Sequence, residues 1–208
     1  NFGVKTFFDT FLQFAAQPQP RKTDQGLIEP EKDQFSGYIF KIQANMNPAH
    51  RDRIAFFRVC SGKFERGMSV NLSRTNKTIK LNQTQAFMAK DRDTVDVAYP
   101  GDIIGIYDPN IYQIGDTLIE GKGQYHYEEL PQFPPELFKR VQAKNVMKSK
   151  QFRKGIEQLV QEGAIQLFKQ ELNDSMILGA VGQLQFEVFE YRMKAEYNVD
   201  IEFTSLGE

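Results

Sequence analysis

Several lysines and arginines of this sequence lie in short polar connections between predicted elements. Their type and spacing suit the binding of phosphate. Lysine and arginine on loops bind a phosphate backbone and read the shape of structured RNA. The first group comprises Arg51, Arg53, Lys63, Arg66, Arg74 and Lys77. The second group comprises Lys144, Lys148, Lys150, Arg153 and Lys154. We expect both groups to contact RNA.

The distribution of charge along the chain supports two interpretations. The net charge is −1, but basic residues outnumber acidic ones by nine to two over residues 46–90 and by seven to one over residues 136–154. Acidic residues dominate residues 91–132 and 155–208. This pattern is typical of solvated strands and helices with uneven charge, and also of basic faces that meet phosphate while acidic faces turn away. We expect a helix to begin near residue 149, and cations at its start oppose the helix dipole, which is mildly unfavourable for stability. This conflict favours a functional reason for the second group.

Catalytic and metal-binding patterns are absent from the sequence. The phosphate-binding string Gly-x-x-x-x-Gly-Lys-Ser/Thr does not occur. Asp102-Ile-Ile-Gly105 and Asn76-Lys77-Thr78-Ile79 resemble pieces of a guanine-nucleotide site, but we interpret them as a strand and a hairpin turn. His50 and His126 stand far apart, and Cys60 has no evident neighbouring base. The sequence therefore predicts no catalytic residue, no metal site and no cofactor bound by this chain itself.

Length and composition indicate a globular protein of one large or two small domains. The chain has 208 residues, of which 40% are hydrophobic and 25% charged. No apolar run approaches the roughly 20 residues that span a bilayer, so we expect no membrane partner. The single cysteine excludes an internal disulfide and fits the reducing cytoplasm.

Residues 1–33 should contain a short helix followed by a linker. From Val4 to Ala16 the apolar residues recur on one side of a 3.6-residue period, and Pro18 and Pro20 end the helix. Residues 21–33 are polar and contain glycine and proline, which is typical of a linker. Because no evident partner for the phenylalanines of this helix follows, we expect it to be the last helix of a missing upstream domain.

Residues 34–132 should form a β-barrel. Turn residues separate short strands, which we expect at 38–44, 54–59, 68–72, 79–81, 84–88 and 102–107. Phe56 and Phe57 should point to opposite faces of their strand. Strands this short favour a closed barrel over an open sheet, because closure removes exposed edges. Loops at one rim of the barrel should then present the first basic group together.

Residues 133–208 should form a ferredoxin-like domain after the boundary Phe133-Pro-Pro135. Periodicity predicts strands at 137–143, 165–168, 176–181 and 199–203, with helices at 149–163 and 184–197, which is the β-α-β-β-α-β order of that fold. Ser149 should cap the first of these helices. The apolar stripe of the second comprises Leu184, Val188, Tyr191 and Ala195.

Motifs in the barrel resemble those of the translational GTPases, in the domain beside the nucleotide-binding domain. They are Arg53-x-Ala-Phe-x-Arg-Val-x-Ser-Gly62, Ala98-Tyr-Pro-Gly-Asp102 and Gly115-Asp-Thr-Leu118. In the next domain, Gly182-Gln-Leu-Gln-Phe-Glu-Val188 resembles the bacterial peptide-chain release factor three family, whereas elongation factor G typically has Gly-Glu-Leu-His-Leu-Glu there. Residues 6–21 also resemble the exit from that family's GTPase domain. The resemblance implies a mixed β and α+β fold, a translation-factor domain II type barrel followed by a ferredoxin-like domain.

The same resemblance implies a function in translation termination. Members of the family use GTP to remove the stop-codon-reading, class-one release factors from the ribosome after peptide release. We expect this chain to be the ribosome-engaging, non-catalytic part, with GTP/GDP and magnesium belonging to an upstream GTPase domain. Its partners would be small-subunit rRNA and protein, that GTPase domain and the class-one release factors, in the cytoplasm.

Alternatives inside and outside this family stay open at this point. Part of an elongation factor G relative or of a ribosome-protection protein would share the barrel, although Gln183-Leu-Gln185 argues against both. A freestanding ligand-binding β-barrel is a different class, but the large side chains of the strands would fill a small barrel. A self-contained enzyme has no constellation of residues to support it.

Overall fold

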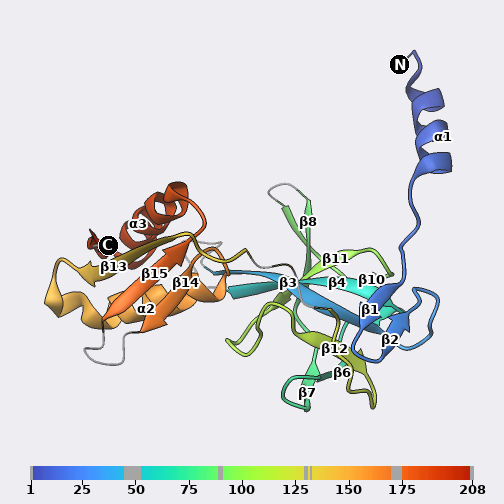
Figure 1. The fold of residues 1–208 in the computed structure, drawn as a ribbon. Coiled ribbons are helices and arrows are strands. Elements are labelled where there is room, and N and C mark those ends of the chain that lie inside the picture. Colours follow the sequence, from blue (N-terminus) through green and yellow to red (C-terminus); the bar gives the residue numbers. More distant parts are fainter. Residues whose placement is uncertain are drawn as a thin grey trace.

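The computed structural model describes residues 2–44, 53–88, 91–128, 131, 133–169 and 175–206, which form a β-rich unit and a C-terminal α/β unit, preceded by a helix (Figure 1). The helical elements are α1 (Val4–Phe14), the 3₁₀ turn η1 (Val146–Lys148), α2 (Ser149–Gln161) and α3 (Gln183–Tyr197). The strands are β1 (Arg21–Thr23), β2 (Gly26–Ile28), β3 (Ser36–Ala44), β4 (Arg53–Ser61), β5 (Phe64–Glu65), β6 (Ser69–Leu72), β7 (Lys77–Lys80), β8 (Thr84–Met88), β9 (Asp91–Thr94), β10 (Val97–Ala98), β11 (Ile103–Tyr107), β12 (Thr117–Glu120), β13 (Leu137–Ala143), β14 (Gln166–Lys169), β15 (Met176–Ala180) and β16 (Ile201–Ser205).

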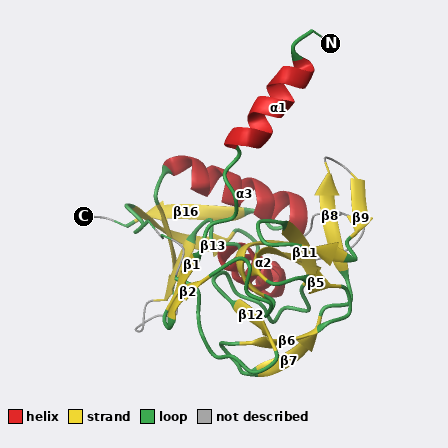
Figure 2. Ribbon diagram, turned by 90° about the vertical axis from the view of Figure 1, so that its right-hand side faces the viewer, coloured by secondary structure: helices red, strands yellow, loops and turns green. Residues whose placement is uncertain are grey.

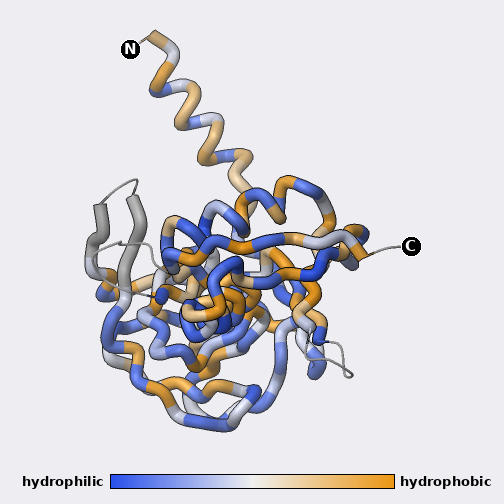
Figure 3. The backbone as a smooth tube through the Cα atoms, turned by 90° about the vertical axis from the view of Figure 1, so that its left-hand side faces the viewer, coloured by the Kyte–Doolittle hydropathy of each residue, from blue (hydrophilic) through white to orange (hydrophobic). Residues whose placement is uncertain are grey.

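Helix α1 stands apart from the rest of the described chain (Figure 1). It begins at Val4, as predicted, and ends at Phe14, close to the predicted end. None of its residues is buried, and hydrophobic positions recur along its length (Figure 3). Pro18 and Pro20 lie in the extended segment that leads to β1, since proline disfavours continuation of a helix. The helix therefore presents an apolar surface to solvent.

Residues 21–33, predicted to be a linker, instead contain the β-hairpin β1–β2. Its two strands pair antiparallel, with Arg21 opposite Ile28. A backbone hydrogen bond of 3.0 Å from the Asp24 N–H to the His126 carbonyl attaches the hairpin to the barrel, and Ile28 is buried in a cluster with Tyr125. The prediction failed because one apolar side chain anchors an otherwise polar segment.

An eight-stranded antiparallel sheet in the order β7-β6-β12-β3-β4-β11-β8-β9 forms the barrel. Its two end hairpins, β6–β7 and β8–β9, project on different sides of the unit (Figure 2). The sheet curves around one core to which Val70 of β6, Phe57 of β4 and Ile104 of β11 all contribute. In the described chain, β7 and β9 do not pair with each other. The ladder is therefore open between β7 and β9, and side chains such as Ile79 of β7 and Ala98 of β10 join the same core.

Large aromatic side chains fill the centre of the barrel. Phe57 is fully buried, and its ring centroid lies 5.6 Å from that of Phe35, which lies 5.9 Å from that of Phe64. Phe56, the preceding residue of β4, lies near Phe40 on the other face, as the alternation of strand side chains predicts. A centre filled in this way argues against a ligand-binding barrel.

The C-terminal unit has the predicted β-α-β-β-α-β order. Its antiparallel sheet has the strand order β14-β15-β13-β16. Helices α2 and α3 pack on one face of this sheet, where Ile156 of α2 and Phe186 of α3 join Leu178 of β15 in a buried core. Ser149 was expected to cap α2, but it is the first helical residue, and Asn145 caps η1 instead.

The predicted apolar stripe of α3 is wrong. The helix buries Phe186, Phe189 and Met193 against the sheet. Leu184 and Tyr191, which belong to the predicted stripe, are 69% and 74% exposed. Both sets of residues fit a 3.6-residue period, so the position of the sheet decides which set is buried.

The C-terminal end of α2 connects the two units. The carboxylate Oε1 of Glu162 accepts a hydrogen bond of 2.8 Å from the Ala44 N–H at the end of β3. The adjacent Gln161 accepts a hydrogen bond from the guanidinium of Arg53, at the start of β4. Arg192 of α3 pairs with the same Glu162 carboxylate, so this short segment contacts both the barrel and α3.

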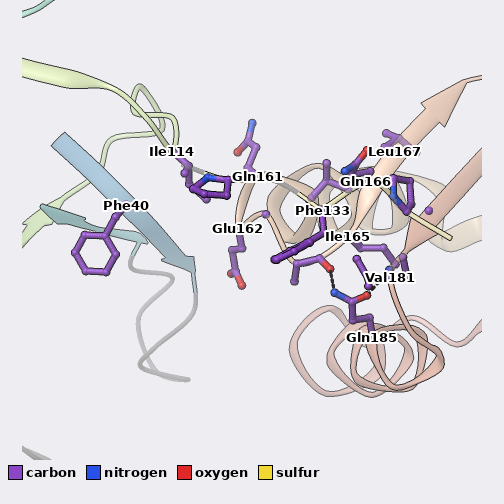
Figure 4. Close-up of a pocket in the computed structure, with 17 residues that line it drawn as sticks. Phe40, Ile114, Phe133, Gln161, Glu162, Ile165, Gln166, Leu167, Val181 and Gln185 are labelled. Atoms are coloured by element: carbon purple, nitrogen blue, oxygen red, sulfur yellow. Dashed lines mark hydrogen bonds between the residues drawn. The ribbon is translucent and has the colours of Figure 1, made fainter. Parts of the chain in front are cut away.

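A pocket of about 660 Å³ lies beside this connection. Figure 4 shows Phe40 and Ile114 on the barrel side, and Ile165, Gln166 and Val181 on the side of the C-terminal unit.

No helix in the described part of the chain is long and apolar enough to span a bilayer.

Candidate nucleic-acid interface

The structure brings the second basic group together around the start of α2. We call it the α2 basic cluster, and it comprises Lys144, Lys148, Lys150, Arg153 and Lys154. Lys144 follows β13, and Lys148 is the N-cap of α2. The other three are exposed, and their spacing of i, i+3 and i+4 places them on one side of the helix. Phe152 and Ile156 hold the opposite side against the core.

Positive charge in this cluster is only partly balanced. Lys194 Nζ lies 3.0 Å from Asp200 Oδ1, and this hydrogen bond, with the charges of Lys194, Lys148 and Lys144, lowers the pKa of Asp200. The three cations on the helix itself form no ion pair with the residues that the structure describes. The first turn of α2 contains no acidic residue, so the charge of Lys150 in that turn opposes the helix dipole without compensation.

An apolar tip projects from the centre of the cluster. Val146 and Met147, in η1, are 83% and 91% exposed. Asn145 fixes this turn because its Oδ1 accepts a hydrogen bond of 2.9 Å from the Met147 N–H. Apolar side chains flanked by cations can insert between bases while the cations bind phosphate. The sequence prediction missed this tip, because two adjacent apolar residues do not reveal whether they are buried.

The first basic group is divided between two ends of the barrel. Leu72 and Lys77 pair beside the turn of the β6–β7 hairpin, which carries Arg74. At the other end of the hairpin, the Gly67 N–H donates a hydrogen bond to the Leu81 carbonyl. Arg66 is the residue before Gly67 and therefore lies at this end. Lys63 lies in the β4–β5 turn, beside the start of β3. The prediction that one rim presents these cations together is therefore wrong.

Carboxylates pair with most of the cations of the first group. Lys63 Nζ lies 2.7 Å from Glu65, which raises the pKa of Lys63, and Arg66 Nε lies 3.0 Å from Asp96. Arg74 donates to both carboxylate oxygens of Asp116, at 2.6 and 3.0 Å, and to the carbonyl of Ile111 at 2.9 Å. Lys77 is exposed and forms no ion pair with the described residues. Arg51 lies outside the described residues.

Arg53 has a structural environment. It is 5% exposed, and its Nε lies 2.5 Å from Oδ2 of Asp108, whose side chain is fully buried. Its Nη1 donates to Asn110 at 2.7 Å and also to Gln161 of the other unit. The guanidinium is thus surrounded by acceptors of the protein and is not accessible to a phosphate. Sequence reasoning missed this role because Asp108 and Gln161 are distant in the chain.

The remaining titratable groups of the barrel have packing or turn roles. Burial raises the pKa of Cys60 to about 11, which keeps the thiol protonated and inert at neutral pH. His126 Nδ1 lies 3.1 Å from Asp24, and the hydrogen bonds from His126 lower the pKa of that aspartate. Within the described residues, no cluster of three or more side chains could hold a metal ion. His50 lies outside them.

Two family models match adjacent parts of this chain. The model described as Elongation factor G domain 2 matches residues 34–121, which form most of the barrel. The model described as Class II release factor RF3, C-terminal domain, matches residues 127–207, which include all of β13 to β16. A crystal structure of a protein from Thermus thermophilus superposes with a TM-score of 0.76 over 97% of this chain and 29% of that chain. At 20% sequence identity, this likeness concerns the fold alone.

Curated relatives carry one name across several genera. The chain is 62% identical to Peptide chain release factor 3 of Listeria welshimeri over 208 residues, and 62% identical to Peptide chain release factor 3 of Enterococcus faecalis. It is 59% identical over 209 residues to the protein of that name from Streptococcus agalactiae. The chain is covered completely in each comparison and spans about 40% of the length of these relatives. These identities do not favour an elongation factor G relative or a freestanding ligand-binding barrel, and the chain belongs to the peptide chain release factor 3 family.

Proposed function

We propose that this chain is the ribosome-binding, non-catalytic part of a GTPase that releases class-one release factors from the ribosome after termination. Its partners are small-subunit rRNA and protein, the GTPase domain of the same protein and the class-one release factors, in the cytoplasm. We also propose that residues 1–33, 34–132 and 133–208 are its functional divisions. Membership of the release factor 3 family supports a role in the release of class-one release factors, and the α2 basic cluster supports the contact with RNA.

The observation that carries the proposal is the uncompensated charge of α2. Lys150 opposes the helix dipole in the first turn, and Lys150, Arg153 and Lys154 gain no ion pair among the described residues, so they do not contribute evident stability. Cations that lower the stability of their own helix are consistent with selection for an external anion. A phosphate backbone supplies that anion at regular spacing.

Guanine nucleotide and magnesium belong, in this proposal, to the GTPase domain. The two nucleotide-like strings of the chain do not fit such a site. Asp102 accepts a hydrogen bond of 2.8 Å from the Tyr99 N–H in the turn before β11, and Asn76 lies in the β6–β7 turn with φ 53°. Both side chains serve their own turns, and no step of nucleotide chemistry is derived from them.

Ribosome binding by charge variants tests the proposal. The triple variant Lys150→Glu, Arg153→Glu, Lys154→Glu should sediment with ribosomes at least tenfold more weakly than the unaltered chain at ~0.1 M salt. Each lost phosphate contact should also reduce the slope of log affinity against log salt by about 0.7 to 0.9. A charge-matched control reverses Lys22, Lys80 and Lys122, which are exposed and lie on the β-rich unit.

The control decides between a local and a general effect. The control variant should keep more affinity than the α2 variant, although both lower the net charge equally. Equal weakening by the two variants, or binding that does not depend on salt, would contradict a specific role of the α2 basic cluster.

A further inference from the structure

The apolar tip formed by Val146 and Met147 gains nothing from the packing of its own unit. Both side chains are almost fully exposed, and neither belongs to the core of the C-terminal unit. Covering such side chains with a partner removes apolar surface from water, which is favourable. The tip is therefore a candidate contact surface, and its surroundings indicate the ligand.

Hydrogen bonds hold the backbone beneath the apolar tip in a fixed shape. The side chain of Asn145 accepts from the Met147 N–H, and its carbonyl accepts from the Lys148 N–H at 3.1 Å. Lys148 Nζ also donates to the carbonyl of Asn198, the C-cap of α3, so the turn is attached to the end of that helix. The tip is thus preorganised, which lowers the entropy cost of binding a partner.

Positive charge surrounds the apolar tip along the chain. Residues 137–156 contain no aspartate or glutamate. Three lysines lie within three residues of the tip, namely Lys144, Lys148 and Lys150. A cationic surface of this kind attracts a polyanion and disfavours a basic partner.

Carboxylates near the start of β16 do not cancel this charge. Asp200 pairs with Lys194 at 3.0 Å, and Glu202 accepts a hydrogen bond of 3.4 Å from Gln142. Counted with Lys194, the lysines of this region outnumber the two carboxylates by four to two. The surroundings of the apolar tip therefore keep an excess of positive charge.

Two apolar side chains on a convex turn suit RNA better than a protein. A stable protein interface buries roughly 800 Å² per partner around an apolar centre, which two side chains among lysines do not provide. On RNA, phosphate contacts supply much of the affinity, so a small apolar contact is sufficient to select a feature of the bases. A continuous A-form helix keeps its bases stacked, and its major groove is too deep and narrow for side chains to read. An apolar tip therefore reaches a base face only at a bulge, a loop or an open step.

We propose that Val146 and Met147 pack against an unstacked base of the RNA whose phosphates bind the α2 basic cluster. The inference rests on the proposed function, because that cluster supplies the affinity, and it adds the class of RNA, a site with a bulged or looped-out base. The polarisable thioether of Met147 makes favourable contacts with an aromatic ring. The branched side chain of Val146 offers a stiff apolar surface beside it.

Serine substitutions in the apolar tip test this contact on purified bacterial ribosomes. Val146→Ser, Met147→Ser should weaken binding about tenfold, because apolar burial is lost. The slope of log affinity against log salt should stay unchanged, since no phosphate contact is removed. Met147→Leu should bind within about twofold of the unaltered chain, because it conserves apolar volume. A matched control, Leu184→Ser, Val188→Ser, removes two exposed apolar side chains from α3 and should leave the affinity unchanged.

Chemical probing separates an RNA occupant from a protein occupant. The unaltered chain should protect at least one unpaired base of the ribosomal RNA from dimethyl sulfate or a carbodiimide. The serine variant, at a saturating concentration, should leave that base reactive. Unchanged affinity of the serine variant, or a smaller salt slope in that variant, would overturn the proposal. Weaker binding with every base protection intact would also overturn it and would assign the apolar tip to a protein.

The charge variant of α2 distinguishes the failure of this inference from the failure of the proposed function. If the triple glutamate variant binds ribosomes as tightly as the unaltered chain, the proposed function fails. If the triple variant binds weakly and the serine variant binds normally, only the contact of the apolar tip with a base fails.

Discussion

Two groups of basic residues, one on the barrel and one on α2, have opposite surroundings. On the barrel, Arg74 is held by Asp116 at 2.6 Å, and Arg53 is buried beside Asp108. On α2, the three exposed cations have no described ion-pair partner, and the helix dipole adds to the positive potential around them. The barrel has more cations, whereas α2 has more uncompensated charge.

This difference teaches that the number of basic residues in a segment does not determine the potential at its surface. Carboxylates from residues 91–132, an acidic segment of the sequence, neutralise barrel cations from residues 46–90 after folding. Asp96, Asp108 and Asp116 all come from that acidic segment. Folding thus pairs basic and acidic segments of the sequence within the barrel, whereas the exposed cations of α2 gain no carboxylate among the described residues.

The largest expected effect concerns the buried pair of the barrel. Asp108→Asn keeps the shape and the hydrogen-bond acceptor of the side chain but leaves the Arg53 charge buried without its carboxylate. We expect the free energy of unfolding to fall by about 3 to 5 kcal/mol. Urea denaturation followed by far-ultraviolet circular dichroism measures this change.

A second substitution serves as the control for this pair. Adding Arg53→Met removes the unpaired charge and should recover part of the lost stability. A change below ~1 kcal/mol for Asp108→Asn alone would show that Arg53 is not a structural residue, and the contrast between the two basic groups would fail.

A smaller effect of opposite sign is expected on α2. Lys150→Glu places a negative charge in the first turn of the helix, which complements the dipole, and it adds a favourable i, i+4 pair with Lys154. The free energy of unfolding of the C-terminal unit should rise by about 0.3 to 1 kcal/mol. Lys150→Gln should give an intermediate value. Destabilisation by the glutamate would indicate that the lysine has a structural partner.

The smallest effect is expected at the carboxylate next to the cluster. Asp200→Asn removes the partner of Lys194 and should strengthen polyanion binding about twofold, the scale of an exposed pair. Because folding lowers the pKa of Asp200, its contribution to stability is present above about pH 4 and is lost as the pH falls through the lowered value. In an acid titration, the variant should therefore lose less stability than the unaltered chain below about pH 4. Identical titrations would contradict this pairing.

Sequence reasoning predicted most strands and helices because local signals agree with the fold. Phe56 and Phe57 occupy opposite faces of β4, as alternation requires, and α2 ends before Gly163, whose φ of 79° suits glycine. The α2 basic cluster was also predictable, since its members lie close in sequence and helical spacing collects them on one side.

What the sequence could not predict depends on contacts between distant residues. The ion pair of Arg53 with Asp108 requires that β4 and β11 be neighbours, which no local pattern indicates. The buried side of α3 was assigned to the wrong residues because the helix is apolar on two sides. The exposed contact between the rings of Phe138 and Phe168 becomes visible only through the register of β13, β15 and β14.

Gln161 and Glu162 attach the C-terminal end of α2 to the barrel, so the position of this helix depends on the barrel. The helix has 13 residues and is therefore about 20 Å long, since each residue adds about 1.5 Å along the axis. Its N-terminal half carries the exposed cations, and its C-terminal end is bonded to β3, β4 and α3. Because Phe152 and Ile156 also pack α2 into the core of the C-terminal unit, a rotation at the C-terminal end moves the cations together with that whole unit.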